Sequence, residues 1–583
     1  WPPKQAQWWI NGQKDEGLRA AHIHETGDPH LATMLRIYRE YEDVCNRLGV
    51  IDFAELLLRA LELWKQHPAV LEHYQQRFRH ILVDEFQDTN AVQYAWLRLL
   101  AGTTSGVTAV GDDDQSIYGW RGAKVENILS YERHFAGTHI VKLEQNYRST
   151  ANILTAANAV IARNAERLGK NLWTDSGEGE PIALYAAFNE HDEARYIADR
   201  LHSWVQQGNQ RADAAILYRS NAQSRVLEAA LLQADIPYRI YGGQRFYERL
   251  EIKNALAYLR LMMNCHDDTA FERVVNVPPR GIGDRTIEAI RSLAREQSTS
   301  LWTAAAAMVS ESRMPARASN AVAVFLELIN EMSGQLNELP LHEQAEHAIG
   351  RSGLIEMHRR EKGERGQSRV ENLEELIGAC RNFEPEDQTQ PILPQFLDQV
   401  ALDAGDRQAD EDQDAVQLMT LHSAKGLEYP LVFIAGMEEN LFPHKMSLDE
   451  PGRLEEERRL AYVGITRAMK KLYLTFAETR SIYGSESFNS VSRFIRDIPK
   501  EVIEEVRLQS TVSRPTSYAR AGMLSDENES TGFSLGQGVF HGVYGEGVIL
   551  NFEGMGPRAR VHVRFADAGT KILILASANL AAL

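Results

Sequence analysis

Two adjacent carboxylates follow a short apolar run near residue 84. Asp84 and Glu85 come directly after residues 81–83, Ile-Leu-Val, and Asp88 follows three residues later. A continuous apolar run of this kind predicts a strand that is buried on both faces, as in parallel sheets. Ligands bind beyond the carboxyl ends of such strands, where two acids can hold Mg²⁺ and prepare a water molecule. The alternative is a strand that runs into a solvated acidic turn.

A second apolar run, residues 107–110, ends in a long polar loop. In this loop the Gln115 amide can orient a water molecule or a phosphate. Tyr118 and Trp120 can stack on unpaired bases, and Arg121 adds a guanidinium beside them. The alternative is a surface turn whose Trp packs back onto the core. An aromatic pair and an arginine within four residues favour contact with nucleic acid.

The elements that position these side chains can be read from the apolar pattern. Residues 81–83, 92–100 and 107–110 predict strand, helix and strand, which is the βαβ unit of a doubly wound α/β sheet. The preceding residues, 1–79, have a helical pattern. Further apolar runs predict a second parallel sheet, interrupted by an almost wholly helical region at residues 244–415; these runs are residues 182–185, 214–219, 431–434 and 472–476.

Length and composition set the broad class. With 583 residues, 44% of them hydrophobic and 25% charged, the chain is expected to form roughly three to five globular, soluble domains. It contains no apolar run of membrane-span length and no signal peptide, and its three cysteines fit neither a metal motif nor a disulfide framework. A cytoplasmic location is expected. The net charge of −18 opposes non-specific attraction to nucleic acid but permits a local basic groove.

Five stretches together resemble the successive motifs of the superfamily 1 DNA helicases of the UvrD/PcrA/Rep family. The order and spacing of these motifs are highly specific, and the resemblance covers essentially the whole chain. The stretches are DEFQD at residues 84–88, GDDDQSIYGWRGA at 111–123, QNYRST at 145–150, VQLMTLHSAKGLE at 416–428 and EEERRLAYVGITRA at 455–468.

The resemblance implies two RecA-like parallel-sheet lobes with ATP between them, each lobe carrying a helical insert. The first lobe is expected to be incomplete. The implied division is a partial helical insert of the first lobe at 1–78, the partial first lobe at 79–144, the second lobe at 145–241 and 414–509, its helical insert at 242–413, a linker at 510–534 and a small C-terminal β-barrel at 535–583.

The resemblance also implies roles for individual residues. Asp84 would hold Mg²⁺, Glu85 would activate the attacking water, and Gln115 would sense the γ-phosphate. Tyr147 would stack on the adenine and Glu428 would contact the ribose. The remaining residues would bind the γ-phosphate or single-stranded DNA: Arg148 and Arg467 as arginine fingers, and Tyr118, Trp120, Arg121 and His422 on the DNA.

A second DNA contact is expected within the long helical region. Gly281 and Gly283 flank an isoleucine just before a helix, so their backbone N–H groups can face a phosphate. Arg280 and Arg285 would add positive charge. In the family, a similar loop contacts duplex DNA ahead of the fork. The alternative is an ordinary helix–helix turn.

The last 74 or so residues have a different character. Residues 510–534 are rich in Ser, Thr, Asn and Gly and predict a flexible linker. Short strands with Gly turns follow, at residues 538–540, 547–550 and 561–565, and predict a small β-barrel. This region resembles the Tudor-like tail of the family, which is implicated in contacts with RNA polymerase. The alternative is an appendage that only adds stability.

The chain contains no G-x-x-x-x-G-K-[ST], the loop that cradles phosphates with its backbone N–H groups. Its Gly169–Lys170 pair has Asn164 in place of the first Gly and Asn171 in place of Ser or Thr. The chain also opens at Trp1, in the middle of a helical pattern. The expectation is therefore a fragment whose family carries the phosphate loop upstream.

The implied function is that of an ATP-dependent 3′→5′ DNA helicase of nucleotide excision and mismatch repair, acting on single-stranded DNA and on single-strand/duplex junctions. Repair proteins and RNA polymerase are the expected protein partners. As a fragment, the chain is expected to be inactive alone, with a destabilised first lobe. The alternative is a natural truncated protein that binds DNA or a partner without hydrolysing ATP.

Overall fold

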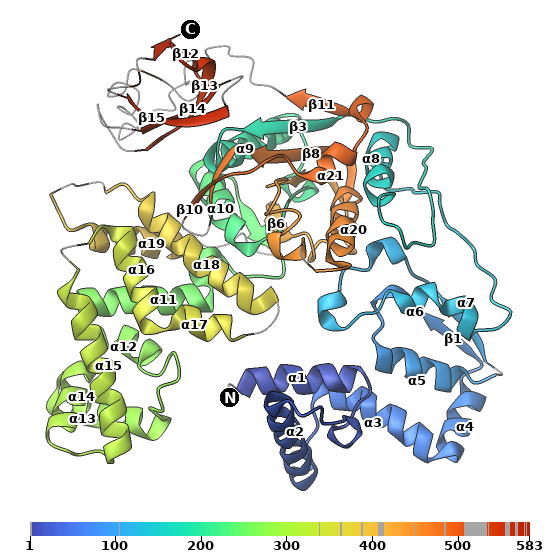
Figure 1. Cartoon of the computed structure of the whole chain (residues 1–583), viewed down its shortest axis with the longest axis horizontal. Helices are drawn as coiled ribbons and strands as arrows, with labels where there is room; N and C mark the ends of the chain where they lie inside the picture. Colours follow the sequence, from blue (N-terminus) through green and yellow to red (C-terminus); the bar gives the residue numbers. More distant parts are fainter. Residues whose placement is uncertain are drawn as a thin grey trace.

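The computed structural model describes most of the chain. The described residues are 3–103, 105–336, 339–361, 364–385, 387, 389–405, 413–448, 450–482, 485–506, 533, 536–553, 560–565, 569–575, 578 and 580–582. Figure 1 shows their arrangement, from the amino-terminal helices to the C-terminal sheet. We call β1 to α7, with the helices that precede them, the first lobe, and the large parallel sheet with its covering helices the second lobe.

The chain opens with the helices α1 (Pro3–Asp15), α2 (Pro29–Leu48), α3 (Phe53–Gln66) and α4 (Pro68–Arg77). Asp28 and Asp52 cap the amino ends of α2 and α3 with their side chains. The buried Lys14 of α1 joins this helix to α3, since its ammonium lies 2.7 Å from Asp52 and 2.8 Å from Glu55. The helical pattern predicted for residues 1–79 is thus confirmed.

The predicted strand–helix–strand unit forms in the first lobe. β1 (His80–Val83) pairs in parallel with β2 (Gly106–Ala109), and α5 (Ala91–Ala101) connects them. Phe86, Tyr94 and Leu97 form the core between this sheet and its helices, which include the short α6 (Glu126–Leu129) and α7 (Tyr131–His134). The expectation of burial on both faces is wrong, because Leu82 on the opposite face is 79% exposed. Among the described residues, β1 and β2 pair only with each other.

The described part of the second lobe contains a seven-stranded sheet in the order β11-β3-β8-β7-β4-β6-β5. All of its neighbouring strands run parallel, which confirms the predicted α/β class with a large parallel sheet. The strands are β3 (Ile182–Ala187), β4 (Ala214–Tyr218), β5 (Tyr238–Ile240), β6 (Val416–Thr420), β7 (Tyr429–Ile434), β8 (Ala468–Ala477) and β11 (Ile503–Val506). A hairpin of β9 (Thr479–Ile482) and β10 (Ser485–Phe488) extends from β8.

Helices cover both faces of this sheet (Figure 1). On one face, α8 (Ala151–Ile161), α20 (Arg453–Ile465) and α21 (Arg493–Asp497) bury apolar side chains against the strands. On the other face, α9 (Glu190–Gln206) and α10 (Ser224–Gln233) do the same. Because both faces are covered, the strands read as nearly continuous apolar runs, and β4 is buried along its whole length.

Between β5 and β6 the chain leaves the sheet and forms a helical insert. Its helices are α11 (Leu250–Met263), α12 (Asp268–Val274), α13 (Asp284–Gln297), α14 (Leu301–Ser310), α15 (Ala316–Gly334), α16 (Leu341–Ser352), α17 (Leu354–Arg359), α18 (Glu364–Arg381) and α19 (Ile392–Gly405). They enclose one apolar core of their own. Helix α18 fixes the insert to the second lobe, because Glu371 accepts a bond from Ser220 and Glu375 one from Arg225, each at 2.7 Å.

A buried histidine in this insert predicts a pH dependence. His358 is 2% exposed, its Nδ1 lies 3.1 Å from Glu361, and its Nε2 has no hydrogen-bond partner within the described structure. Burial lowers the pKa of His358 below its ordinary value of about 6.5. The unfolded chain therefore binds a proton more readily, and the free energy of unfolding is expected to fall as the pH drops below about 6.5.

Urea unfolding of the insert at pH 7 and pH 5 checks this. A His358→Asn variant should show a shallower loss of stability over that interval, whereas His342→Asn, at a more exposed site on α16, should keep the slope of the parent chain. Equal slopes for the parent and the His358 variant would contradict the prediction.

The C-terminal region forms an antiparallel sheet whose described strands follow the order β15-β14-β13-β12-β16. These are β12 (Gly538–His541), β13 (Gly545–Glu553), β14 (Arg560–Phe565), β15 (Gly569–Ile574) and β16 (Ala581–Ala582). The three predicted strands are confirmed, but no pairing between described residues joins β15 to β16 to close a barrel. The sheet contacts the second lobe through Arg564 and Glu478, 2.6 Å apart. The predicted linker, 510–534, lies outside the described residues except for Phe533.

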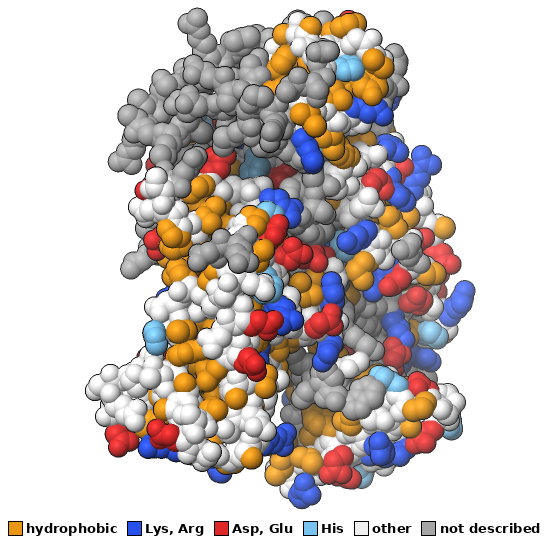
Figure 2. Space-filling model, turned by 60° about the vertical axis from the view of Figure 1, so that its left-hand side comes forward, with side chains coloured by type: hydrophobic (Ala, Val, Ile, Leu, Met, Phe, Trp, Pro, Cys, Tyr) orange, Lys and Arg blue, Asp and Glu red, His pale blue; other side chains and the backbone are white. Residues whose placement is uncertain are grey.

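Three further features concern the cysteines, the helices and the surface charges. Cys45, Cys265 and Cys380 are free. Within the described chain, every helix is too short or too polar to cross a membrane. Figure 2 shows Lys and Arg side chains interspersed with Asp and Glu over one face of the molecule, so the negative net charge leaves room for local basic surfaces.

Candidate functional site

The acidic pair lies immediately after β1, on the surface. Both Asp84 and Glu85 are exposed, and Asp84 accepts a hydrogen bond from the backbone N–H of Glu85 at 2.9 Å. Glu85 has a φ of 48°, a left-handed conformation that is uncommon for a residue with a side chain. Gln87 donates to the Glu85 carboxylate at 2.5 Å and thereby orients it. The two carboxylates are therefore available to a metal ion and a water molecule.

A lysine from the second lobe completes this cluster. The Lys425 ammonium lies 2.6 Å from Asp88 and 3.2 Å from Glu85, and it donates to the backbone carbonyl of Gln115 at 2.9 Å. Its side chain is only 6% exposed. Burial raises the pKa of Asp88, and the neighbouring Lys425 opposes that shift. Lys425 joins the two lobes at the acidic pair. Sequence reasoning did not single it out, although it lies within the matched stretch 416–428.

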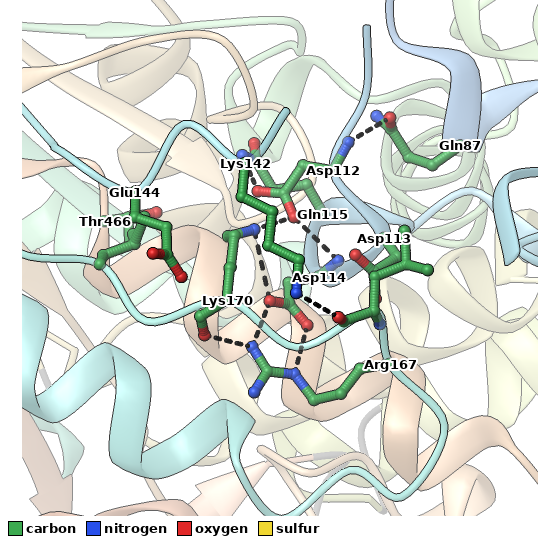
Figure 3. A network of polar contacts seen from close by, with 12 residues as sticks. Gln87, Asp112, Asp113, Asp114, Gln115, Lys142, Glu144, Arg167, Lys170 and Thr466 are labelled. Atoms are coloured by element: carbon green, nitrogen blue, oxygen red, sulfur yellow. Dashed lines mark hydrogen bonds and ion pairs between the residues drawn. The ribbon is translucent and has the colours of Figure 1, made fainter. Parts of the chain in front are cut away.

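The loop after β2 is held by a network of charges (Figure 3). Gln115 donates to Asp112 at 2.7 Å, and Lys170 forms an ion pair with the same carboxylate. Asp114, 1% exposed, accepts two bonds from Arg167 at 3.0 and 2.6 Å. Arg167 and Lys170 follow α8 of the second lobe, so this network also crosses between the lobes. The side chain proposed to sense a phosphate is thus positioned by Asp112 and, through it, by Lys170.

The same loop contains three consecutive acids, Asp112, Asp113 and Asp114, whose ligand atoms lie close enough together to share a metal ion. Among the described residues, this is the one such group. The Asp113 carboxylate accepts the backbone N–H of Leu168 at 2.8 Å, and burial raises the pKa of Asp113. Arg167 pairs with Asp114 and Lys170 pairs with Asp112, so groups of the chain itself already bind all three carboxylates. It acts as a structural junction, and Asp84 remains the candidate metal ligand.

Arg148 and Glu428 lie together in the second lobe. Arg148 donates through Nε to Glu428 at 2.5 Å, and both side chains are partly exposed. Tyr147 is 80% exposed, and its hydroxyl donates to Gln145 at 2.9 Å. The exposed Tyr147 ring offers a stacking surface, and Arg148, the next residue in the chain, and its partner Glu428 can bind a phosphate and a ribose.

Arg467 lies deeper than the role of an arginine finger requires. Its guanidinium donates to the backbone carbonyls of Val463 at 2.9 Å and Leu427 at 3.0 Å, and the residue is 2% exposed. Burial, and then the nearby positive charge of Arg148, lower the pKa of Arg467 to about 10. The structure thus brings Arg467 next to the 425–428 segment but leaves its guanidinium bonded to the backbone.

The aromatic loop lies on the surface. Trp120 is 41% exposed and lies in the short 3₁₀ helix η4 (Gly119–Arg121). The guanidinium of Arg121 lies 4.5 Å from the Trp120 ring centre and 5.2 Å from that of Tyr118. Tyr118 donates to the backbone carbonyl of His422 at 3.3 Å. The alternative in which the Trp packs into the core is therefore excluded. Tyr118, Trp120, Arg121 and His422 form one surface that spans both lobes.

The predicted loop of the helical insert is only partly available to DNA. Gly281 has a φ of 81°, Gly283 precedes α13, and both glycines and Arg285 are exposed. Arg280 points inward, where its guanidinium donates to the Tyr258 hydroxyl at 2.7 Å and to backbone carbonyls. The exposed N–H groups and Arg285 remain candidates for a phosphate, whereas Arg280 supports the loop from inside.

Two family models match the chain. Residues 1–136 match the UvrD/REP helicase N-terminal domain, and residues 141–479 match the UvrD-like helicase C-terminal domain. The resemblance of the five motifs is thereby confirmed.

Three similar proteins extend this match. The chain is 58% identical over 582 residues to DNA helicase II of Escherichia coli, covering 100% of this chain and 81% of that protein. It is 52% identical to DNA helicase II of Haemophilus influenzae, over 99% and 80% of the two chains. It is 40% identical to the ATP-dependent DNA helicase PcrA of Bacillus subtilis, over 93% and 76%. The chain belongs to the UvrD-like family of DNA helicases.

Proposed function

We propose that these residues form part of an ATP-dependent 3′→5′ DNA helicase that acts in nucleotide excision and mismatch repair. The observation that carries the proposal is the position of the 425–428 segment. At one end, Lys425 contacts Glu85 and the loop of Gln115; at the other, Glu428 contacts Arg148. Residues 425–428 thus connect Glu85 of the first lobe to Arg148 of the second lobe. A nucleotide site between two lobes requires such a connection.

The residues present fit ATP and Mg²⁺ in part. Asp84 would hold the metal, Tyr147 the adenine and Glu428 the ribose, and these three side chains are all exposed. Phosphoryl transfer to water supplies the free energy for movement along DNA. Glu85, oriented by Gln87, would accept the proton of the attacking water. Arg148, and Arg467 after it leaves its backbone carbonyls, would place positive charge on the γ-phosphate.

The phosphate-cradling loop is not supplied by these 583 residues, whose sequence contains no G-x-x-x-x-G-K-[ST]. Lys170, in the single Gly-Lys pair, binds Asp112 and Asp114 instead of a phosphate site. We propose that a segment outside these residues supplies the loop and further strands of the first lobe. The 79% exposure of Leu82 in β1 supports this, since apolar side chains of a parallel strand are normally covered, and Val110, directly after β2, is 54% exposed.

The missing loop also favours a second candidate, a protein that binds DNA or a partner without hydrolysing ATP. The helicase, and a truncated protein that binds DNA, would both bind single-stranded DNA with the Tyr118–Trp120–Arg121 surface. The two candidates differ in whether the natural polypeptide carries a phosphate loop. A reading frame upstream of Trp1 that encodes this loop supports the helicase, and a start codon there without such a frame supports the truncated protein.

Replacing Trp120 with Ala tests the DNA site. Stacking of one base on an aromatic side chain contributes about 1–3 kcal/mol, so the affinity for single-stranded DNA is expected to fall about 5- to 150-fold. Fluorescence anisotropy with a labelled oligo-dT at constant salt measures this. Trp173, 48% exposed and outside the loop, provides the matched control. Equal losses for Trp120→Ala and Trp173→Ala would contradict the assignment.

The C-terminal sheet is proposed to contact other proteins, with repair proteins and RNA polymerase as the expected partners. Its exposed apolar side chains support an interface of this kind. They are Phe540, Val543, Ile572 and Ile574, which are 45–80% exposed. The same sheet also packs on the second lobe, where the Phe488 and His562 rings stack with centroids 5.7 Å apart.

A further inference from the structure

The aromatic loop of the first lobe is capped by a side chain from the second lobe. The Glu456 carboxylate accepts the backbone N–H of Gly119 at 2.9 Å, across 337 positions in sequence. A Cβ atom added at Gly119 would lie 3.1 Å from both carboxylate oxygens, so the two groups are closely fitted. Glu456 lies in the first turn of α20.

This bond satisfies a group that the loop itself leaves open. The first N–H groups of a helix have no partner inside it and need a cap. Tyr118, which precedes η4, provides no side-chain cap. Inside the loop, Arg121 and Ala123 donate to the Tyr118 carbonyl, and Gly122 donates to Gly119. Glu456 supplies an oxygen that caps the Gly119 N–H, and the negative charge of its carboxylate strengthens this exposed bond relative to a neutral one.

Helix α20 connects this cap to the candidate nucleotide site. Arg467 follows the carboxyl end of α20, eleven residues after Glu456, which is about 16 Å along a helix. The helix moves with the second lobe, because Glu457 pairs with Arg219 at 2.7 Å and Arg458 pairs with Asp497. A displacement of the second lobe against the first therefore changes the position of Glu456 relative to the aromatic loop.

We propose that Glu456, from the second lobe, is a positioning residue that sets the conformation of the Tyr118–Trp120–Arg121 surface. The affinity of this surface for single-stranded DNA therefore depends on the relative position of the two lobes. The inference rests on the proposed DNA-binding function of that surface. It assigns Glu456 no contact with DNA, since its oxygen acts on the backbone of the loop.

The test compares Glu456→Gln and Glu456→Ala in the full 583-residue chain, with the affinity for a labelled oligo-dT at constant salt as the readout. An amide oxygen still accepts the Gly119 N–H, so Glu456→Gln is expected to retain most of the affinity. Glu456→Ala leaves the loop uncapped and is expected to weaken binding by about 10-fold. Glu455→Ala removes an equal charge from the same helical turn and is expected to maintain or slightly raise the affinity.

A purely electrostatic effect gives the opposite sign. If Glu456 only repels the DNA, both of its substitutions tighten binding to a similar extent, as does Glu455→Ala, and the proposal fails. Unchanged affinity in Glu456→Ala also overturns it. A parent chain that binds no single-stranded DNA refutes the proposed function itself, which is a distinct result.

Hydrogen exchange without DNA provides a second readout. Amide exchange in residues 117–123 is expected to be faster in Glu456→Ala than in the parent chain, with α20 unchanged and Glu456→Gln close to the parent. Exchange that rises throughout α20 would show loss of the helix rather than of the cap, and unchanged exchange in the loop would show that the bond does not hold it. Either outcome overturns the positioning role.

Discussion

Replacing Glu85 with Gln is expected to lower the rate of DNA-stimulated ATP hydrolysis by about 10²- to 10⁴-fold in a polypeptide that joins these residues to a phosphate-binding loop. A positioned general base contributes a factor of that size, and the amide of Gln cannot accept the proton of the attacking water. The structure supports Glu85 for this role because its carboxylate is exposed beyond β1 and oriented by Gln87.

Steady-state turnover at saturating oligo-dT measures the effect, with Glu132→Gln as the control. Glu132 is an exposed acid on α7, so its replacement changes the net charge equally without touching the acidic pair. The affinity for DNA should be unaffected by either change. The 583 residues alone are expected to show no ATP hydrolysis that depends on Glu85. Turnover by this chain that depends on Glu85 would mean that phosphate is held without the loop, against our proposal.

Replacing Arg480 with Met is expected to destabilise the second lobe by about 3–5 kcal/mol, because it leaves buried carboxylates without their cation. Arg480 is 4% exposed, donates to Glu438 at 2.5 Å, and also forms an ion pair with Glu193. Burial alone would lower the pKa of Arg480, but the two carboxylates raise it well above its ordinary value.

Equilibrium unfolding in guanidinium measures this loss of stability, and native-state hydrogen exchange in β8 provides a second measurement. Arg493→Met is the matched control, since Arg493 pairs with Glu439 at 2.7 Å but is 39% exposed, and such pairs contribute about 0–1 kcal/mol. A loss no larger than that of Arg493→Met would contradict the prediction.

Apolar periodicity predicted the elements of this fold well. The run at 431–434 became β7, the run at 472–476 lies within β8, and the helix predicted at 92–100 is α5 with one further residue at each end. These patterns report burial against neighbours that cover both faces. The same reasoning failed for Leu82, because the burial of a strand depends on which elements cover it and the described residues cover one face of β1.

The candidate site was predicted less completely, for geometric reasons. The motifs predicted Glu85, Gln115 and Arg148 as site residues. Lys425 and Glu456 contact residues more than 300 positions away in the sequence, so only the folded chain shows these contacts. Side-chain direction is equally hidden from the sequence. Arg280 and Arg467 lie at the predicted positions, yet their guanidinium groups point into the protein and bond backbone carbonyls.

The ion pairs of Arg167 and Lys170 with the loop of Asp112 and Asp114 have a thermodynamic consequence. Asp114 is buried, so separating the lobes leaves its carboxylate without the guanidinium that compensates it. Unfolding of either lobe therefore removes a stabilising partner from the other, and their melting transitions are coupled. A ligand that binds only the first lobe raises the melting temperature of the second as well, through the acids and bases that they share.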